Sequence, residues 1–198
     1  MNLLAHAYLS FDQPDILIGN MISDYVKGKQ KNTYAEGIQK GIILHRAIDN
    51  FTDHHPATDA AKKFFQPHYR LYAGPFVDIV YDHFLANDSN EFENKLMLSV
   101  FCSNTYTELE KSSSLMPEKF SRMIPYMIAQ NWLYNYRLKE GIRQSFNGLV
   151  RRAAYLEESV IAYEIFNEEY NNLQTCYRQF FPALKTFAVH TINQLNNN

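Results

Sequence analysis

One stretch of the sequence, residues 41–53, combines a histidine and two aspartates with apolar residues in a helical pattern. In GIILHRAIDNFTD, the residues His45, Asp49 and Asp53 are spaced four apart, so on an α-helix they share one face. The apolar residues between them indicate that part of this helix packs inward, and a buried carboxylate needs a cation, a hydrogen-bond donor or a metal. A single pair of this kind is more often a solvated or hydrogen-bonded polar face than a ligand set, so recurrence elsewhere in the chain decides between the two interpretations.

The same spacing recurs in two further apolar segments. Asn20 and Asp24 are four apart in ILIGNMISDYV, and Asp78 and Asp82 are four apart in PFVDIVYDHFLAND, where His83 follows directly. Three such pairs on three helices can converge in the interior of a helical bundle. The recurrence therefore favours a functional site over three unrelated polar faces.

Histidine and aspartate together favour a hard to borderline divalent ion, such as Mn²⁺ or Mg²⁺. His6, near the start of the chain, could complete the ligand set, although alone it would more often be structural. An ion held in this way activates water and neutralises charge on a phosphoryl oxygen, which suits phosphoester hydrolysis. Arg46, beside His45, could hold a phosphate oxygen, but an arginine at this position is as often a surface salt-bridge partner. Motifs of other catalytic classes, such as GxSxG, a Walker loop and HExxH, are absent from the sequence.

The elements that must position these residues are predicted to be helices throughout. Apolar periodicity is helical, and no sustained alternation or hairpin turn predicts a strand. We therefore expect an all-α fold, a single-domain helical bundle over residues 1–198. A capping-box pattern, Thr33 to Glu36, places the start of the central helix at Thr33. The other helices expected are 1–9, a helix ending near Gly28, 57–65 closed by Pro67, one opened by Pro75, 92–110, 156–175 and a last one over 176–195, interrupted at Pro182.

Composition excludes several classes of function. The net charge is -2, with 19 basic and 21 acidic residues, so a general nucleic-acid-binding protein is not expected. Apolar residues make up 46% of the chain but form no run approaching the ~20 needed to span a bilayer. The first residues lack a basic segment and a cleavage site, so we expect a cytoplasmic protein. The two cysteines, Cys102 and Cys176, are far apart and are expected to be buried free thiols.

Four segments of the chain, MNLLAH, IGNMISDYVKG, GIILHRAIDNFTD and VYDHFL, resemble in order and spacing the acyl carrier protein phosphodiesterase family. Weaker similarity in NWLYNYR and QFFPAL extends this resemblance over nearly the whole chain. The resemblance implies an all-helical relative of the HD-type metal phosphohydrolases with Mn²⁺ as the favoured ion. It also implies the reaction, hydrolysis of the phosphodiester that joins 4'-phosphopantetheine to a serine of holo-acyl carrier protein.

The resemblance also implies roles for the polar residues. Asp24, His45 and Asp82, together with His6, are expected to hold the metal. The usual HD signature is His followed by Asp, whereas this chain has Asp82-His83, so ligands cannot be mapped from the wider superfamily. Three residues are expected to be catalytic: Asp49 orients His45 or acts as base, His83 protonates the departing serine oxygen, and Arg46 stabilises the phosphoryl oxygens. The residues expected to bind the substrate are Asn20, Lys27, Asp53 and Asp78.

Acyl carrier proteins are acidic, so docking should use a basic surface. The candidates are Lys27, Lys29, Lys31, Lys40 and the pair Arg151-Arg152. Two other functions remain open at this stage. One is an HD-type metal phosphohydrolase that acts on a nucleotide or another small phosphoester. The other is a helical protein that binds acyl carrier protein without cleaving it, which the ionisable groups among core residues disfavour.

Overall fold

The computed structural model describes residues 1–197, and every regular element within them is helical. The all-α prediction is therefore confirmed for this part of the chain. The α-helices are α1 (Leu3–Tyr8), α2 (Pro14–Ile22), α3 (Glu36–His54), α4 (Pro56–Tyr69), α5 (Ala73–Ala86), α6 (Lys95–Lys111), α7 (Glu118–Ser121), α8 (Ile124–Ala129), α9 (Trp132–Asn135), α10 (Lys139–Arg152), α11 (Val160–Glu168) and α12 (Tyr170–Asn196). Short 3₁₀ turns are η1 (Ser23–Tyr25), η2 (Gly28–Thr33), η3 (Arg70–Tyr72) and η4 (Ser113–Leu115). None of the helices in residues 1–197 is long and apolar enough to cross a membrane.

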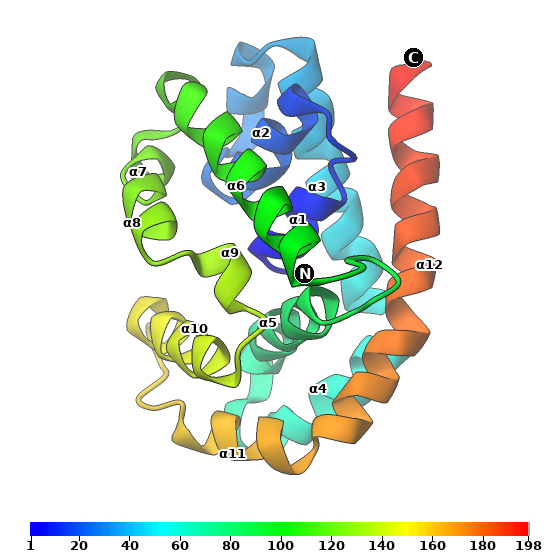
Figure 1. Cartoon of the computed structure of the whole chain (residues 1–198), viewed down its shortest axis with the longest axis vertical. Helices are drawn as coiled ribbons and strands as arrows, with labels where there is room; N and C mark the ends of the chain where they lie inside the picture. The colour runs from blue at the N-terminus through cyan, green and yellow to red at the C-terminus, as the bar shows by residue number, and fades with distance from the viewer. Residues whose placement is uncertain (198) are drawn as a thin grey trace.

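The helices pack around the short first helix, α1, which lies near the middle of the molecule (Figure 1). It contacts α2 on one side and α5 on the other. The long helix α12 runs along one edge of the molecule and contacts α3, α4 and α5 (Figure 1). Aromatic side chains fill the core where α4, α5 and α10 meet, with the Phe76 ring 5.8 Å from Phe65 and 4.9 Å from Phe146 between centroids. This arrangement surrounds α1 with larger helices on both sides.

Two glycines bring α2 and α3 into backbone contact. A Cβ atom added to Gly19 would lie 2.0 Å from the carbonyl oxygen of Ile38, and one added to Gly41 would lie 2.3 Å from that of Ile16. No side chain larger than hydrogen fits at either position without moving a helix. The close approach places Asn20, which follows Gly19, against the helix that carries the central polar residues.

Several predicted helix ends are wrong, for local reasons. Helix α3 begins at Glu36 rather than Thr33, because the Thr33 hydroxyl donates to the carbonyl of Gln30 at 2.8 Å within η2. The predicted helix 156–175 is divided between α11 and α12, and Glu158 caps α11 by accepting from the backbone N–H of Ile161 at 3.2 Å. Local hydrogen bonds thus override the capping-box pattern and the apolar periodicity from which these ends were predicted.

Two prolines lie inside continuous helices, although Pro67 was expected to close one helix and Pro182 to interrupt another. Pro67 is within α4 and Pro182 is within α12. Both are exposed, so the carbonyl that loses its helical N–H partner faces water. The buried neighbours of Pro182 hold α12 against the core on its other face. Cys102 and Cys176 are free and buried, as predicted.

Candidate metal centre

Side chains from α1, η1 and α3 converge on one point. His6 Nε2 lies 3.2 Å from Asp49 Oδ1, and His45 Nε2 lies 3.0 Å from Asp49 Oδ2. Asp24 joins them from η1, its Oδ1 lying 3.2 Å from His45 Nε2. The two imidazole rings are stacked, with centroids 3.9 Å apart and an interplanar angle of 16°. The sequence predicted that these helices would converge, and the structure brings these four side chains together.

Asn20 fixes the orientation of both histidines. Its side-chain Oδ1 lies 2.8 Å from His6 Nδ1, and its backbone oxygen lies 2.7 Å from His45 Nδ1. The Asn20 Nδ2 donates to the His6 carbonyl at 2.8 Å and to Ser10 Oγ at 3.1 Å, which leaves Oδ1 as the acceptor. Because both Nδ1 atoms face oxygen acceptors, each must carry a hydrogen. In a neutral ring the Nε2 atom is then the one with a free lone pair.

The donor set fits a divalent cation. Ligand atoms of His6, His45 and Asp49 all lie within 4.8 Å of one another. Each Nε2 lone pair faces carboxylate oxygens, and such electron pairs repel unless a proton or a cation lies between them. Histidine ligands that donate their other ring N–H to an oxygen are typical of metal sites, because that bond fixes the tautomer and the ring orientation. Nitrogen and carboxylate donors together suit Mn²⁺ and similar ions.

The pKa shifts within the cluster reflect the same contacts between the histidines and the carboxylates. Burial lowers the pKa of His45, but hydrogen bonds with Asp24 and Asp49 outweigh it and raise that pKa to about 9. Burial and the neighbouring charge of His45 lower the pKa of His6, so the two stacked rings do not share the same charge state. Burial opposes ionisation of Asp49, yet the contacts of its carboxylate with His45 and His6, together with the nearby α-amine, hold its pKa well below the usual range. A proton on His45 therefore occupies the position that a metal would take.

Asp82, which was expected to be a metal ligand, lies outside this cluster. Its carboxylate accepts hydrogen bonds from three backbone N–H groups at the start of α1, those of Leu4 at 2.7 Å and of Asn2 and Ala5 at 3.3 Å each. Burial raises the pKa of Asp82 to about 7, although the three N–H donors act to lower it. The structure thus places Asp82 as the cap of the helix that carries His6, because the free N–H groups of α1 point at it.

The structure does not bring His83 or Asp78 into the cluster either. His83 Nδ1 lies 2.8 Å from the backbone oxygen of Tyr136, and its Nε2 lies 3.0 Å from the hydroxyl of Tyr170. Both ring nitrogens are thereby engaged in the interior, by Tyr136 and Tyr170. Asp78 accepts from the α-amine of Met1 at 2.9 Å, and that amine lies 3.7 Å from Asp49.

The other expected site residues have separate positions. Asp53, one turn beyond Asp49, is exposed and pairs with Lys62 at 3.3 Å. Arg46 is exposed and its Nη2 donates to the backbone oxygen of Val26 at 3.0 Å, so it holds the segment that follows Asp24. Lys27 is exposed at the start of η2.

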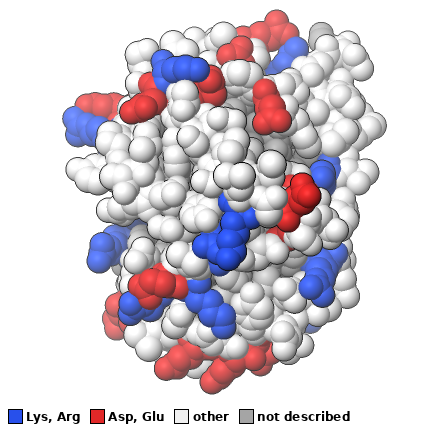
Figure 2. Space-filling model, in the orientation of Figure 1, with Lys and Arg blue, Asp and Glu red and all other residues white. Residues whose placement is uncertain are grey.

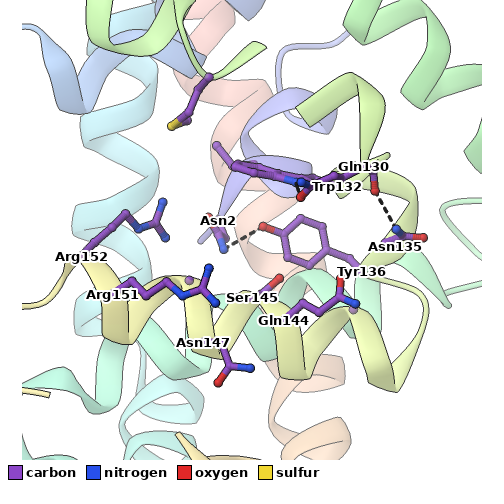
Figure 3. Close-up of a pocket in the computed structure, with 14 residues that line it drawn as sticks. Asn2, Gln130, Trp132, Asn135, Tyr136, Gln144, Ser145, Asn147, Arg151 and Arg152 are labelled. Atoms are coloured by element: carbon purple, nitrogen blue, oxygen red, sulfur yellow. Dashed lines mark hydrogen bonds between the residues drawn. The ribbon is translucent and has the colours of Figure 1, made fainter. Parts of the chain in front are cut away.

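A cleft of about 700 Å³ adjoins the start of α1, and sequence reasoning did not identify it. Trp132, Tyr136, Arg151 and Arg152, from α9, α10 and the turn between them, line it together with Asn2 (Figure 3). Neither Trp132 nor Tyr136 was among the site residues expected from the sequence. Their distance along the chain from the polar pairs left no periodic signal that would connect them with the site.

Several known proteins that are similar to this chain carry the same description as the family model that matches it. The family model for acyl carrier protein phosphodiesterase matches residues 1–184. An acyl carrier protein phosphodiesterase of Photorhabdus laumondii is 30% identical over 184 residues, 93% of each chain. The proteins of the same description from Enterobacter sp. (strain 638) and Escherichia coli O139:H28 are 28% and 27% identical, over 95% and 96% of this chain and 97% and 98% of their own. No solved structure matches the chain.

Proposed function

The chain belongs to the acyl carrier protein phosphodiesterase family, and on that premise we propose that the His6, Asp24, His45 and Asp49 cluster is the centre at which it acts. The family consists of phosphoric diester hydrolases that convert holo-acyl carrier protein to apo-acyl carrier protein. The reaction breaks the ester bond between the phosphate of 4'-phosphopantetheine and a serine of the carrier, and water supplies the new oxygen.

The observation that carries this assignment is the locked pair of imidazoles. Asn20 orients both rings so that each Nε2 faces the carboxylate of Asp49, which is the arrangement of a metal site. We propose Mn²⁺ as the ion, with Mg²⁺ or another divalent ion as the alternative, bound by His6, His45 and Asp49, with Asp24 as the fourth ligand. When bound, such an ion lowers the pKa of a coordinated water towards ~7 and neutralises charge on a phosphoryl oxygen.

Exposure divides the roles within the cluster. The side chains of His6 and His45 are 5% and 7% exposed, whereas those of Asp49 and Asp24 are 40% and 77% exposed. The substrate phosphate therefore approaches on the carboxylate side. In our proposal the carboxylate oxygen of Asp24 that does not bind the metal accepts the proton of the attacking water, and Asp49 keeps the two histidines oriented towards the centre.

Two residues leave the roles first expected for them, which were a catalytic role for His83 and metal binding for Asp82. His83 is bonded at both ring nitrogens and Asp82 caps α1, so in our proposal neither contacts the substrate. Both act on the structure around the centre instead. We also propose that residues 1–198 form one domain, which a continuous core from α1 to α12 supports, and that the helical His and Asp ligands reflect an HD-like origin.

For the carrier protein itself we propose docking near η2. Lys27, Lys29 and Lys31 follow Asp24 closely along the chain, whereas Lys40 is paired with Glu36 at 2.8 Å. On the face of the molecule in Figure 2, acidic and basic side chains are interspersed, so a local basic segment rather than a general field has to attract an acidic partner. Charge reversal of Lys27 and Lys29 should raise KM far more than it lowers kcat, and an unchanged KM would contradict this docking site.

The function is tested with the substrate itself. Purified protein is incubated with holo-acyl carrier protein and Mn²⁺, with and without EDTA, and the mass of the carrier is measured. We expect loss of the phosphopantetheine mass only where metal is present. The same preparation is assayed against nucleoside monophosphates and cyclic nucleotides. Hydrolysis of these with an unchanged carrier mass would favour the small-phosphoester alternative.

A further inference from the structure

The cleft beside the metal centre has a mixed polar and aromatic lining. Amide side chains of Asn2 and Gln144 and the hydroxyl of Ser145 lie in it, next to the rings of Trp132 and Tyr136 (Figure 3). Its volume of about 700 Å³ falls within the range of small-molecule sites. Such a lining matches an elongated ligand that carries several amides and short apolar segments.

Two sets of contacts connect the cleft with the metal centre. On one side, Asn2 Nδ2 donates to the Tyr136 hydroxyl at 3.0 Å, and the preceding residue, Met1, has its amine 3.7 Å from Asp49. On the other side, the Tyr25 hydroxyl lies 3.5 Å from the sulfur of Met123, a lining residue. Tyr25 is adjacent in sequence to Asp24. A ligand that fills the cleft therefore ends next to the carboxylate side of the centre.

Two arginines make this cleft positively charged. Arg151 and Arg152, at the end of α10, extend their guanidinium groups into it (Figure 3). Within residues 1–197 neither forms an ion pair with a carboxylate, although other exposed arginines, such as Arg143, do. Burial raises the pKa of Tyr25, which the charge of Arg152 lowers and that of Asp24 raises, so Arg152 and Asp24 lie near the same tyrosine. A guanidinium at this place can bind a phosphate in two-pronged fashion.

We propose that this cleft binds the phosphopantetheine arm of the carrier protein, with Arg152 at the phosphate and the amide-bearing side chains and Trp132 along the arm. The proposal rests on the proposed function. The arm contains two amides, a hydroxyl and a dimethyl-substituted carbon, which match the hydrogen-bonding and apolar groups of the lining. It follows that Arg151 and Arg152 recognise the arm rather than the acidic surface of the carrier.

Gly148 provides a selective way to fill the cleft. It lines the cleft from within α10, and a Cβ atom added to it would meet no other atom within 4 Å. Gly148→Leu therefore places a branched side chain in the open space without a backbone clash. Since glycine inside a helix is unfavourable, the substitution should not destabilise the fold. Gly148→Ala is the matched control, because it changes the same backbone position and adds a single methyl group.

Trp132 reports on binding directly, because it is the single tryptophan of the chain and lines the cleft. Its fluorescence is followed while free 4'-phosphopantetheine is added to the full-length protein in EDTA. We expect a saturable change in the wild type and in Gly148→Ala, at least tenfold weaker binding in Arg152→Ala, and none in Gly148→Leu. Lys29→Ala, in the exposed η2 segment outside the cleft, should bind like the wild type.

The absence of a saturable change in the wild type, or equal binding by Gly148→Leu, would overturn the inference. Tighter binding of AMP than of phosphopantetheine would also overturn it, since the cleft would then be a nucleotide site. The binding assay needs neither metal nor turnover, so its result does not depend on whether the chain converts holo-carrier. Conversion of holo-carrier without arm binding would refute the inference but leave the proposed function intact. Arm binding without conversion would support the inference but contradict the proposed function.

Discussion

Replacing Gly41 by alanine would place a methyl carbon 2.3 Å from the carbonyl oxygen of Ile16, 2.9 Å from the Cα of Gly19 and 3.0 Å from the backbone nitrogen of Asn20. All three neighbours are backbone atoms of α2, so no side-chain rotation relieves the contact. Ordinary van der Waals contact begins at 3.4 Å. Helices α2 and α3 must therefore separate by about 1 Å, and we expect a loss of about 1–3 kcal/mol in the free energy of unfolding.

The same displacement should weaken the metal centre. The backbone oxygen of Asn20 lies 2.7 Å from His45 Nδ1, so a shift of this size lengthens that hydrogen bond beyond its useful range. Loss of such an orienting bond typically costs 10–100-fold in metal affinity. We expect Gly41→Ala to bind Mn²⁺ about tenfold or more weakly than the wild type, as measured by isothermal titration calorimetry.

Gly148→Ala is the control for this experiment. It is also a glycine-to-alanine change within a helix, but its new methyl group meets no atom within 4 Å. Urea unfolding of the two variants should therefore give opposite signs, with Gly148→Ala more stable than the wild type by about 0.5–1 kcal/mol. If Gly41→Ala were as stable as the wild type and bound Mn²⁺ equally well, the close contact of α2 and α3 would not position the centre.

Two further predictions concern residues beside the centre. Burial lowers the pKa of His83 to about 4, below its ordinary value of 6.5. Between these two pH values the unfolded chain binds more protons than the folded chain does. The free energy of unfolding should therefore fall by up to about 3 kcal/mol as the pH drops from about 6.5 to about 4. Urea unfolding across this pH range should show a flatter profile for His83→Gln than for the wild type, and parallel profiles would contradict the assignment. Asp82→Ala leaves the N–H groups at the start of α1 without their acceptor and should cost about 1–3 kcal/mol. Thermal unfolding that is unchanged in Asp82→Ala would show that this carboxylate does not hold α1.

The helical class could be predicted because apolar periodicity is a local property of the chain. The convergence of the polar pairs could be predicted in part, since residues four apart share a helix face and buried carboxylates need partners. What spacing cannot show is which partner each side chain meets. Asp82 and Asp49 have the same local pattern, but Asp82 faces the free N–H groups of α1 and Asp49 faces two imidazoles.

Other features depend on tertiary contacts that leave no local trace. Asn20 orients both histidines through its side chain and its backbone, and only the approach of α2 to α3 through Gly19 and Gly41 makes this possible. The cleft is built by α9 and α10, more than a hundred residues from the start of α1 that it adjoins. Long-range packing of this kind determines where the chemistry takes place.

The most direct test of the centre measures bound manganese and holo-carrier conversion on the same samples. His6→Ala and His45→Ala are compared with the wild type and with His83→Gln, which changes a buried histidine outside the cluster. Our account predicts that the wild type and His83→Gln bind Mn²⁺ and convert holo-acyl carrier protein, whereas both cluster variants, shown to be folded by circular dichroism, lose the metal and the activity together. Full metal content and activity in His45→Ala, or their loss in His83→Gln alone, would contradict it.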